Sequence, residues 1–365
     1  MSEWQTFCLK DLGKIVGGAT PPTNNPKNYG NKIAWITPKD LSTLRGRYIK
    51  KGSRSISRLG FKSCSCALLP KHAILFSSRA PIGYVAIAEK RLCTNQGFKS
   101  IIPNKKIYFE FLYYLLKYHK DNISNIGGGT TFKEVSGATL GLFEVKIPPT
   151  YYEQQKIART LSVLDQKIEN NHKINELLHT LAYKIYEYYF KYKPKNTKLE
   201  QIIIENPKSN IMVKNAQKTQ DKYPFFTSGD NILSYPKAII DGRNCFLNTG
   251  GNAGIKFYVG KASYSTDTWC ICANEFSDYL YLLLSSIKNH INQSFFQGTS
   301  LKHLQKNLLK KYPIYMPSAH EIKKFNQIMM PLLTLISINT RTSKKLEQIR
   351  DFLLPLLLKQ QVKPQ

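Results

Sequence analysis

The sequence predicts an α+β fold made of two copies of one unit, in which a β-rich globule is followed by a long helix. Three observations predict it: a long internal repeat, a heptad pattern after each globule, and apolar strand patterns separated by Gly-rich turns within the globules. The length of 365 residues leaves room for two such units. The expected architecture is therefore two tandem globules and two long helices, which pack as an antiparallel coiled coil with pseudo-two-fold symmetry.

The repeat also predicts where each helix begins. Both helical patterns follow an apolar strand that stops at proline, and each has a glutamate in its first turn, Glu153 and Glu321. These two glutamates define the residue-number offset of the repeat, 321 − 153 = 168. A carboxylate in the first turn suits the positive end of the helix dipole. The expected boundaries are residues 1–150 and 193–318 for the two globules, and 151–192 and 319–365 for the two spacer helices.

Within each globule, a strand–turn–strand pattern precedes a short helical pattern. Residues 73–85 are similar to residues 244–256, since each segment reads as an apolar strand, a polar Gly-rich turn and a second strand. The aromatic-rich segments 108–118 and 277–287 are predicted to form short helices. A repeat of this length predicts tandem domains and not a solenoid.

A heptad pattern of about five repeats runs through each helix, apolar at both ends and polar in the middle. Asn171 and Asn339 occupy equivalent positions at the middle of the two helical segments, since 153 and 189 average to 171 and 321 and 357 average to 339. They are therefore expected to meet near the pseudo-two-fold axis, where a buried Asn fixes register at a cost in stability. Pro331 and Pro355 predict a kink or a break in the second helix. The seam positions of the first helix, each of which has a counterpart at the repeat offset, are Ile157, Leu161, Leu164, Ile168, Asn171, Asn175, Leu178, Ala182, Ile185 and Tyr189.

The charge of the chain points to a polyanionic partner. Lys and Arg number 53 and Asp and Glu 24, so the formal net charge is 53 − 24 = +29. DNA would compensate this self-repulsion, because Lys and Arg displace condensed counterions from phosphates. An anionic membrane is disfavoured, since the basic residues are spread over both halves. A Lys-rich genomic bias is the alternative explanation.

The sequence also predicts where the protein resides. It contains no run of about 18 uncharged apolar residues, so no membrane span is expected, and its first residues do not resemble a secretory signal. The seven cysteines fit a reducing cytoplasm. The pairs Cys64/Cys66 and Cys270/Cys272 would each share a strand face, which is compatible with a metal edge, but buried small hydrophobic residues explain them better. No metal site is predicted.

The motifs of several enzyme classes are missing from the sequence. There is no phosphate-binding G-x-x-x-x-G-K-[ST] loop, no G-x-G-x-x-G at a helix start and no catalytic tetrapeptide of base-amino methyltransferases. Glu144 and Lys146 have the E-x-K spacing of a nuclease metal site but lack the upstream Pro-Asp. We therefore predict no catalytic residue. The alternatives left open are a methyltransferase or nuclease with an unrecognised site, and a non-catalytic helical adaptor.

Two kinds of segment are candidates for contacting DNA. Residues 39–62 hold eight Lys and Arg against one acid, Asp40, which is typical of a phosphate-contacting region. Gly-flanked polar turns supply the directional donors and acceptors that base recognition needs. A solvated basic face and ordinary β-turn chemistry are the plain alternatives. The predicted DNA-binding residues are Lys39, Arg45, Arg47, Lys50, Lys51, Arg54, Ser77, Ser78, Arg79, Thr130, Thr131, Lys218, Lys222, Ser228, Asn248, Thr249, Asn252, Thr299 and Ser300.

Several short motifs occur in a fixed order through the duplicated unit. They are W-I-T-P-K-D-L at 35–41, T-N-Q-G at 94–97, Y-P-F-F-T-S-G at 223–229, and the segment 141–149 followed by E-Q-Q-K-I at 153–157. Each motif is weak alone, but their order is specific. In these features, and over essentially its whole length, the chain resembles the specificity (S) subunit of type I restriction–modification systems.

This resemblance implies a DNA-recognition subunit without catalytic activity. Each globule would be a target-recognition domain that reads one half of a bipartite site on double-stranded DNA. The helix pair would set the spacing and dock two methyltransferase (M) subunits, which restriction (R) subunits would join. S-adenosylmethionine would bind M and ATP would bind R, so this chain would hold no cofactor. The second helix departs from the pattern, because it has Glu321-Ile322-Lys323 where the first has Glu-Gln-Gln.

Overall fold

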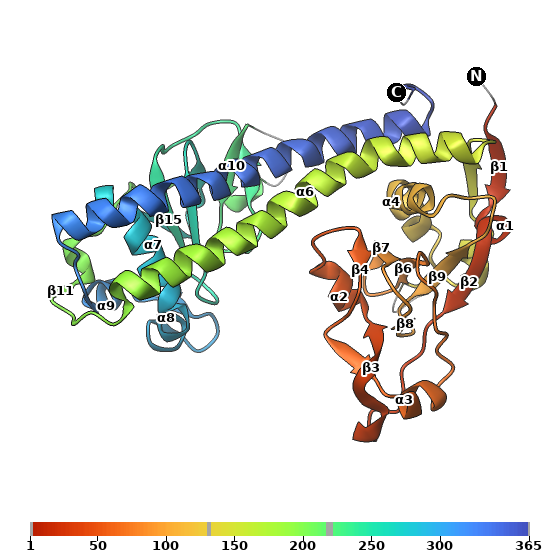
Figure 1. Cartoon of the computed structure of the whole chain (residues 1–365), viewed down its shortest axis with the longest axis horizontal. Helices are drawn as coiled ribbons and strands as arrows, with labels where there is room; N and C mark the ends of the chain where they lie inside the picture. Colours follow the sequence, from red (N-terminus) through yellow and green to blue (C-terminus); the bar gives the residue numbers. More distant parts are fainter. Residues whose placement is uncertain (1–2, 130–132, 217–221, 364–365) are drawn as a thin grey trace. The chain divides into compact units, whose positions relative to one another are not determined.

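A computed structural model describes residues 3–129, 133–216 and 222–363 of the chain. The chain divides into two compact units. Unit 1 comprises Met1–Asn170 and Lys345–Gln365, and unit 2 comprises Asn171–Lys344. Each unit therefore contains one globule together with a stretch of both long helices (Figure 1).

The globule of unit 1 is built on a five-stranded sheet in the order β2-β9-β6-β7-β4, with a three-stranded sheet in the order β5-β3-β8. The first sheet consists of β2 (Gly13–Gly17), β9 (Lys99–Pro103), β6 (Ile74–Ser78), β7 (Ile82–Ala88) and β4 (Tyr48–Ile49). The second consists of β5 (Arg54–Ile56), β3 (Tyr29–Ile36) and β8 (Cys93–Thr94), and β1 (Gln5–Cys8) pairs with β10 (Glu144–Ile147). The helices are α1 (Leu9–Leu12), α2 (Pro38–Ser42), α3 (Arg58–Lys62), α4 (Phe109–Asn125), α5 (Gly137–Gly141) and the 3-10 turn η1 (Pro26–Asn28).

The globule of unit 2 repeats this topology. Its four-stranded sheet has the order β12-β18-β15-β16, which matches β2-β9-β6-β7, and its three-stranded sheet β14-β13-β17 matches β5-β3-β8. The strands are β11 (Thr197–Lys198), β12 (Ile204–Glu205), β13 (Tyr223–Phe226), β14 (Leu233–Tyr235), β15 (Arg243–Asn248), β16 (Ile255–Val259), β17 (Ser263–Tyr264), β18 (Thr268–Cys272), β19 (Phe296–Gln297), β20 (His303–Leu304) and β21 (Pro313–Ile314). The helices are α7 (Ser277–Ser286), α8 (Lys288–Ser294), α9 (Lys306–Lys310) and the 3-10 turns η3 (Leu199–Gln201), η4 (Val213–Asn215) and η5 (Asn274–Phe276). The internal duplication predicted from the sequence is thus present at the level of strand order.

The central strand of each larger sheet explains the core. In β6, Ile74 and Phe76 face α4, whose Phe111, Leu112 and Leu115 join the same buried cluster. Strand β15 and helix α7 form the corresponding core in unit 2. Because both faces of these strands are covered, the apolar residues Ile74, Leu75 and Phe76 of β6 are consecutive and do not alternate with polar ones, and the same holds for residues 245–247 of β15. The two aromatic-rich segments form helices as expected, and each lies against its sheet (Figure 1).

The two long helices are α6 (Tyr151–Tyr186), which ends in a π-helical turn η2 (Glu187–Lys191), and α10 (Ala319–Leu358). Helix α10 continues through Pro331 and Pro355, so a break at these residues is wrong, whereas a kink stays a prediction. Packing is the physical reason, because Met329 and Leu333 on either side of Pro331 are buried in the core of unit 2.

The seam between the helices follows the predicted heptad, since every predicted position on α6 and α10 is buried or half-buried. In unit 2, Asn175 lies opposite Asn339, and Tyr189 contacts Phe325. In unit 1, Asp165 pairs with Arg350. As residue numbers rise along α6, the numbers of the contacting residues on α10 fall, so the two helices run antiparallel.

The register of the polar centre differs from the prediction. Asn171 and Asn339 do not meet: the Nδ2 of Asn171 lies 3.2 Å from Ser343 Oγ, and the Nδ2 of Asn339 donates to Asn175 Oδ1 at 2.9 Å. The two pairs are equivalent under the repeat offset of 168: adding it to 171 gives Asn339, and subtracting it from 343 gives Asn175. Averaging the helix ends therefore placed the pairing four residues away, about one helical turn. Asn171 and Asn339 are equivalent positions of the repeat, as predicted. Each of them, however, pairs with a residue that lies one helical turn away from the other asparagine.

Both helices begin with the same cap. The hydroxyl of Thr150 accepts the N–H of Glu153, and the hydroxyl of Ser318 accepts the N–H of Glu321, as in a capping box. The N–H of Ser318 and the hydroxyl of Tyr315 donate to Glu321 and lower the pKa of its carboxyl to about 2. The glutamates noted in the repeat are thus helix caps.

Candidate nucleic-acid interface

Four loops of unit 1 meet along one edge of the globule, here called the first loop edge (residues 36–40, 78–81, 94–97 and 133–135). Backbone hydrogen bonds join them: Asn95 N–H donates to the Ile36 carbonyl at 2.9 Å, Ser78 N–H to Gly97 at 2.8 Å, and Val135 N–H to Ser78 at 3.0 Å. These loops are far apart in the sequence, so the sheet topology brings them together.

The equivalent loops of unit 2 form a second loop edge (residues 226–230, 249–252, 265–268 and 298–304). Its hydrogen bonds are the counterparts of the first set: Ser265 N–H to the Phe226 carbonyl at 2.9 Å, Thr249 N–H to Asp267 at 3.3 Å, and Leu304 N–H to Thr249 at 3.0 Å. The duplication therefore preserves a polar loop edge as well as the core.

Buried side chains hold the central turn of each edge. In unit 1, Ser77 Oγ donates to the Pro81 carbonyl at 2.8 Å. In unit 2, the Nδ2 of Asn248 donates to the Asn252 carbonyl at 3.1 Å, and Lys256 donates to Asn248 Oδ1. Burial lowers the pKa of Lys256. Ser77 and Asn248, both predicted to contact DNA, are buried and shape the turn, and their contact with DNA stays a prediction.

Asp40, the single acidic residue of the basic segment 39–62, connects two parts of that segment by hydrogen bonds. Asp40 caps α2 by accepting the N–H and the hydroxyl of Thr37, and its other oxygen accepts the N–H of Ser53 at 2.7 Å. Burial acts to raise the pKa of Asp40, but these hydrogen bonds outweigh it and the pKa is lowered. Residues 50–54 are thereby held against α2, which belongs to the first loop edge. The T-x-x-D spacing of Thr37 and Asp40 is the sequence signal that indicates such a capping box.

The remaining predicted residues fall into distinct positions. Ser78 is buried in the first loop edge. Arg79 is half-buried and pairs with Glu134 at 3.5 Å. Thr130, Thr131 and Lys218 lie outside the described residues. Lys222 precedes β13, whereas the second loop edge follows this strand. The predicted residues that are exposed or half-buried on the loop edges or the adjoining segment are Lys39, Lys50, Lys51, Arg54, Arg79, Ser228, Thr249, Asn252, Thr299 and Ser300.

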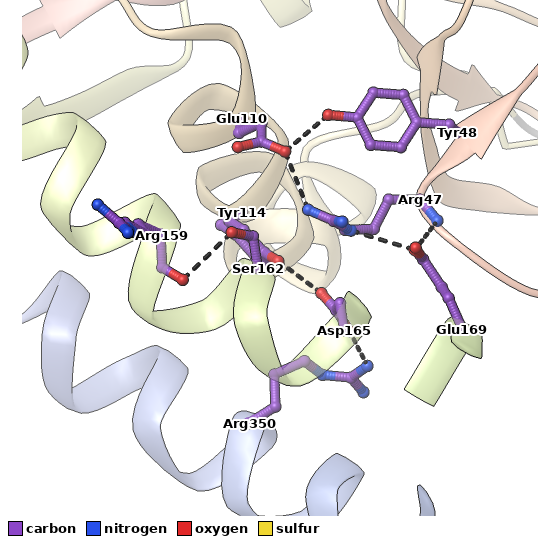
Figure 2. A network of polar contacts seen from close by, with 9 residues as sticks. All are labelled: Arg47, Tyr48, Glu110, Tyr114, Arg159, Ser162, Asp165, Glu169 and Arg350. Carbon is purple, nitrogen blue, oxygen red and sulfur yellow. Dashed lines mark hydrogen bonds and ion pairs between the residues drawn. The ribbon is translucent and has the colours of Figure 1, made fainter. Parts of the chain in front are cut away.

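Arg47 and Arg45 lie away from the loop edge. Arg45 is exposed, in the turn beside α6. Arg47 is only 3% exposed, and its guanidinium pairs with Glu110 of α4 at 2.9 Å and Glu169 of α6 at 3.1 Å (Figure 2). Burial acts to lower the pKa of Arg47, but Tyr114, Glu169 and Glu110 outweigh it and the pKa is raised. The charge of Arg47 is thus used inside the fold, and its contact with DNA stays a prediction. Its two partners are 63 and 122 residues away, and no local sequence pattern indicates them.

The described residues show neither a metal centre nor a transmembrane helix. Within residues 3–129, 133–216 and 222–363, no three His, Cys, Asp or Glu side chains are grouped to hold a metal ion. No helix in this part of the chain is long and apolar enough to cross a membrane. The cysteines are free thiols; Cys66, Cys93, Cys245 and Cys270 are buried, and burial raises the pKa of the Cys93 thiol to about 11.

The fold and the two loop edges define a duplicated recognition protein, with one polar edge for each copy of the unit. Residues 1–180 and 195–348 match the model of the type I restriction modification DNA specificity domain. The chain belongs to this family, whose members are DNA-recognition subunits and not catalytic ones.

Known relatives agree with this assignment. The type I restriction enzyme MjaIX specificity subunit of Methanocaldococcus jannaschii is 32% identical, over 98% of this chain and 93% of that protein. The HindI specificity subunit of Haemophilus influenzae is 31% identical over 46% of this chain and 37% of its own. The crystal structure of a type I restriction–modification S subunit from M. genitalium has the same fold, with a TM-score of 0.66 and 17% identity over 98% of this chain and 96% of that one.

Proposed function

We propose that this chain is the DNA-recognition subunit of a type I restriction–modification complex, and that each globule reads one half of a bipartite site on double-stranded DNA. One observation carries the proposal: the same four loops are assembled twice, through matching hydrogen bonds, and expose polar side chains suited to base edges. In the first copy these loops adjoin exposed lysines and arginines suited to phosphates.

The partners of the subunit are two methyltransferase subunits and, through them, restriction subunits. Exposed apolar residues on α6 and its final turn support docking by a partner helix. Within unit 2 these are Ile174, Leu177, Leu181 and Tyr188, with Leu177 70% and Tyr188 86% exposed. Their spacing places an apolar stripe on the outer face of a helix whose other face is already paired, and such stripes mark interaction sites. The complex works in the prokaryotic cytoplasm.

Deleting the gene in its host tests the proposed function. We expect methylation at one bipartite sequence to disappear from the genome and to return when the gene is restored, because the subunit directs the methyltransferase to that site. Sequencing that detects methylated bases provides the readout. An unchanged methylation map in a host that expresses the chain and its methyltransferase would contradict the proposal.

A triple variant tests the phosphate contacts of the first globule. Replacing Lys39, Lys50 and Lys51 by alanine is expected to weaken DNA binding and to reduce the slope of log affinity against log salt by about 0.9 for each phosphate that is no longer neutralised. The control replaces Lys105, Lys146 and Lys167, which are exposed elsewhere on unit 1, and removes the same charge. Binding titrations at several salt concentrations distinguish the two; equal slopes would place the phosphate contacts elsewhere.

A further inference from the structure

A buried arginine joins the first globule to a long helix. Arg47 lies between Glu110 of α4 and Glu169 of α6, and its backbone N–H also donates to Glu169 Oε1 at 2.9 Å (Figure 2). The other donors to Glu110 are the hydroxyls of Tyr48 at 2.6 Å and Tyr108 at 2.9 Å. Both carboxylates are thus held by more than one hydrogen bond.

This arrangement constrains how the globule sits on α6. A guanidinium is planar and its N–H groups have fixed directions, so a rotation of the globule would break several charged hydrogen bonds together. Leaving a buried charge without its partner is strongly destabilising, so only one orientation of the globule on α6 keeps all the charged groups paired. Helix α4 packs on β6, and β6 leads directly into residues 78–81 of the first loop edge. The clamp therefore acts on the loop edge through a rigid path within unit 1.

Unit 2 has a clamp of the same kind made from different residues. Arg243 donates to both oxygens of Asp278 on α7 at 2.6 Å, and to Thr334 Oγ1 and the Met330 carbonyl on α10 at 3.0 and 3.3 Å. Asp278 is the counterpart of Glu110, because their numbers differ by the repeat offset (278 − 110 = 168). Arg243 begins β15, however, and Arg47 precedes β4, so the arginines are not copies of each other.

A second contact is common to both clamps. Glu169 accepts the N–H of Arg47. Its counterpart at the repeat offset is Ser337 (337 − 169 = 168), which accepts the N–H of Val259 at 3.0 Å. In each unit, therefore, the same position on a long helix accepts a backbone N–H from the globule. Two arginines at different positions thus connect globule and helix in an equivalent way. This indicates that the connection itself is needed.

We infer that Arg47 and Arg243 are positioning residues that hold each loop edge at one orientation on the long helix of its own unit, so that the complex accepts a single separation between the half-sites. This inference rests on the proposed function. It assigns spacing discrimination to the junction of globule and helix in addition to the helices themselves. Neither arginine contacts DNA in this proposal, and the bases read at each half-site stay the same.

The test measures methyl transfer by the chain assembled with its methyltransferase. The DNA substrates carry both half-sites with the native gap or a gap one base pair shorter or longer. We expect Arg47→Met and Arg243→Met each to lower the preference for the native gap by about tenfold, because small misplacements change rates strongly. Base preference at both half-sites should be unchanged. Lys167→Met, an exposed change on α6, should keep the wild-type preference.

Glu169→Gln provides a second variant if Arg47→Met folds poorly. Its amide oxygen keeps an acceptor for Arg47 N–H but removes the charge, so we expect a smaller loss of gap preference in the same direction. Three results would overturn the inference. They are an unchanged gap preference in folded variants, an equal loss of activity at all gaps, and loss of fold in both Arg47→Met and Glu169→Gln. If the wild-type complex methylates no bipartite DNA, the proposed function itself fails, which is a different outcome.

Discussion

Replacing Arg350 by methionine is expected to lower the free energy of unfolding by about 3–5 kcal/mol, the usual cost of leaving one charge of a buried pair without its partner. In unit 1, Arg350 Nη1 of α10 lies 2.7 Å from Asp165 Oδ1 of α6, and Tyr114 of α4 donates its hydroxyl to the other oxygen at 2.5 Å (Figure 2). Burial acts to lower the pKa of Arg350, but Asp165 outweighs it and the pKa is raised. Lys117 is a nearby cation whose pKa burial and Arg350 lower, and its attraction to Asp165 favours the lower end of the range.

Unit 2 shows how the same place can be filled without charge. At the repeat offset, the counterparts of Asp165, Arg350 and Tyr114 are Leu333, Ala182 and Leu282, all buried in its core. The triple variant Asp165→Leu, Arg350→Ala, Tyr114→Phe imitates this solution. We expect its free energy of unfolding to be no more than about 1 kcal/mol below that of the parent, because apolar replacement of a buried pair is often neutral or stabilising.

Equilibrium unfolding in urea distinguishes these outcomes, with circular dichroism and tryptophan fluorescence as independent probes. The comparison between single and triple variants separates the cost of an unpaired charge from the loss of packing. If Arg350→Met lost less than about 1 kcal/mol, the pair would behave as a solvated surface pair. If the triple variant were as unstable as the single one, packing and not charge would explain the loss.

Replacing Gly18 by alanine is expected to disrupt the first loop edge. An added Cβ would lie 2.0 Å from the Asn95 carbonyl oxygen and 2.4 Å from that of Thr94. The hydrogen bond from Ala19 N–H to the Thr94 carbonyl at 3.0 Å keeps the two segments from moving apart freely. Because backbone atoms must move, we expect a loss of about 1–3 kcal/mol in the free energy of unfolding. DNA binding should weaken as well, since Thr94 and Asn95 begin one of the edge loops.

Gly17→Ala is the matched control for this change. It lies next in the chain, and nothing is within 4 Å of its added Cβ. We therefore expect a change within about 0.5 kcal/mol and unaltered DNA affinity. Urea unfolding and DNA titration of both variants complete the test. Equal behaviour of the two variants would show that the close approach at Gly18 has no energetic consequence.

The repeating features of this protein could be predicted from the sequence. The offset between Glu153 and Glu321, the two heptads and the paired strand–turn–strand patterns predicted two copies of a unit with antiparallel helices. These features are readable because they are local or periodic: a helix buries every third or fourth residue, and a duplication keeps its spacing. The same regularity carried the resemblance to S subunits.

The roles of individual polar residues, in contrast, follow from contacts that only the folded chain makes. Arg47 pairs with acids 63 and 122 residues away, Ser77 and Asn248 turn inward, and the asparagines of the seam pair one turn from the position expected. Pro331 does not break its helix because the packing of Met329 and Leu333 outweighs local propensity. Burial and long-range pairing depend on which segments the fold brings together. Composition identifies a basic segment, but only three-dimensional contacts separate the arginine used inside the fold from the lysines left on the surface.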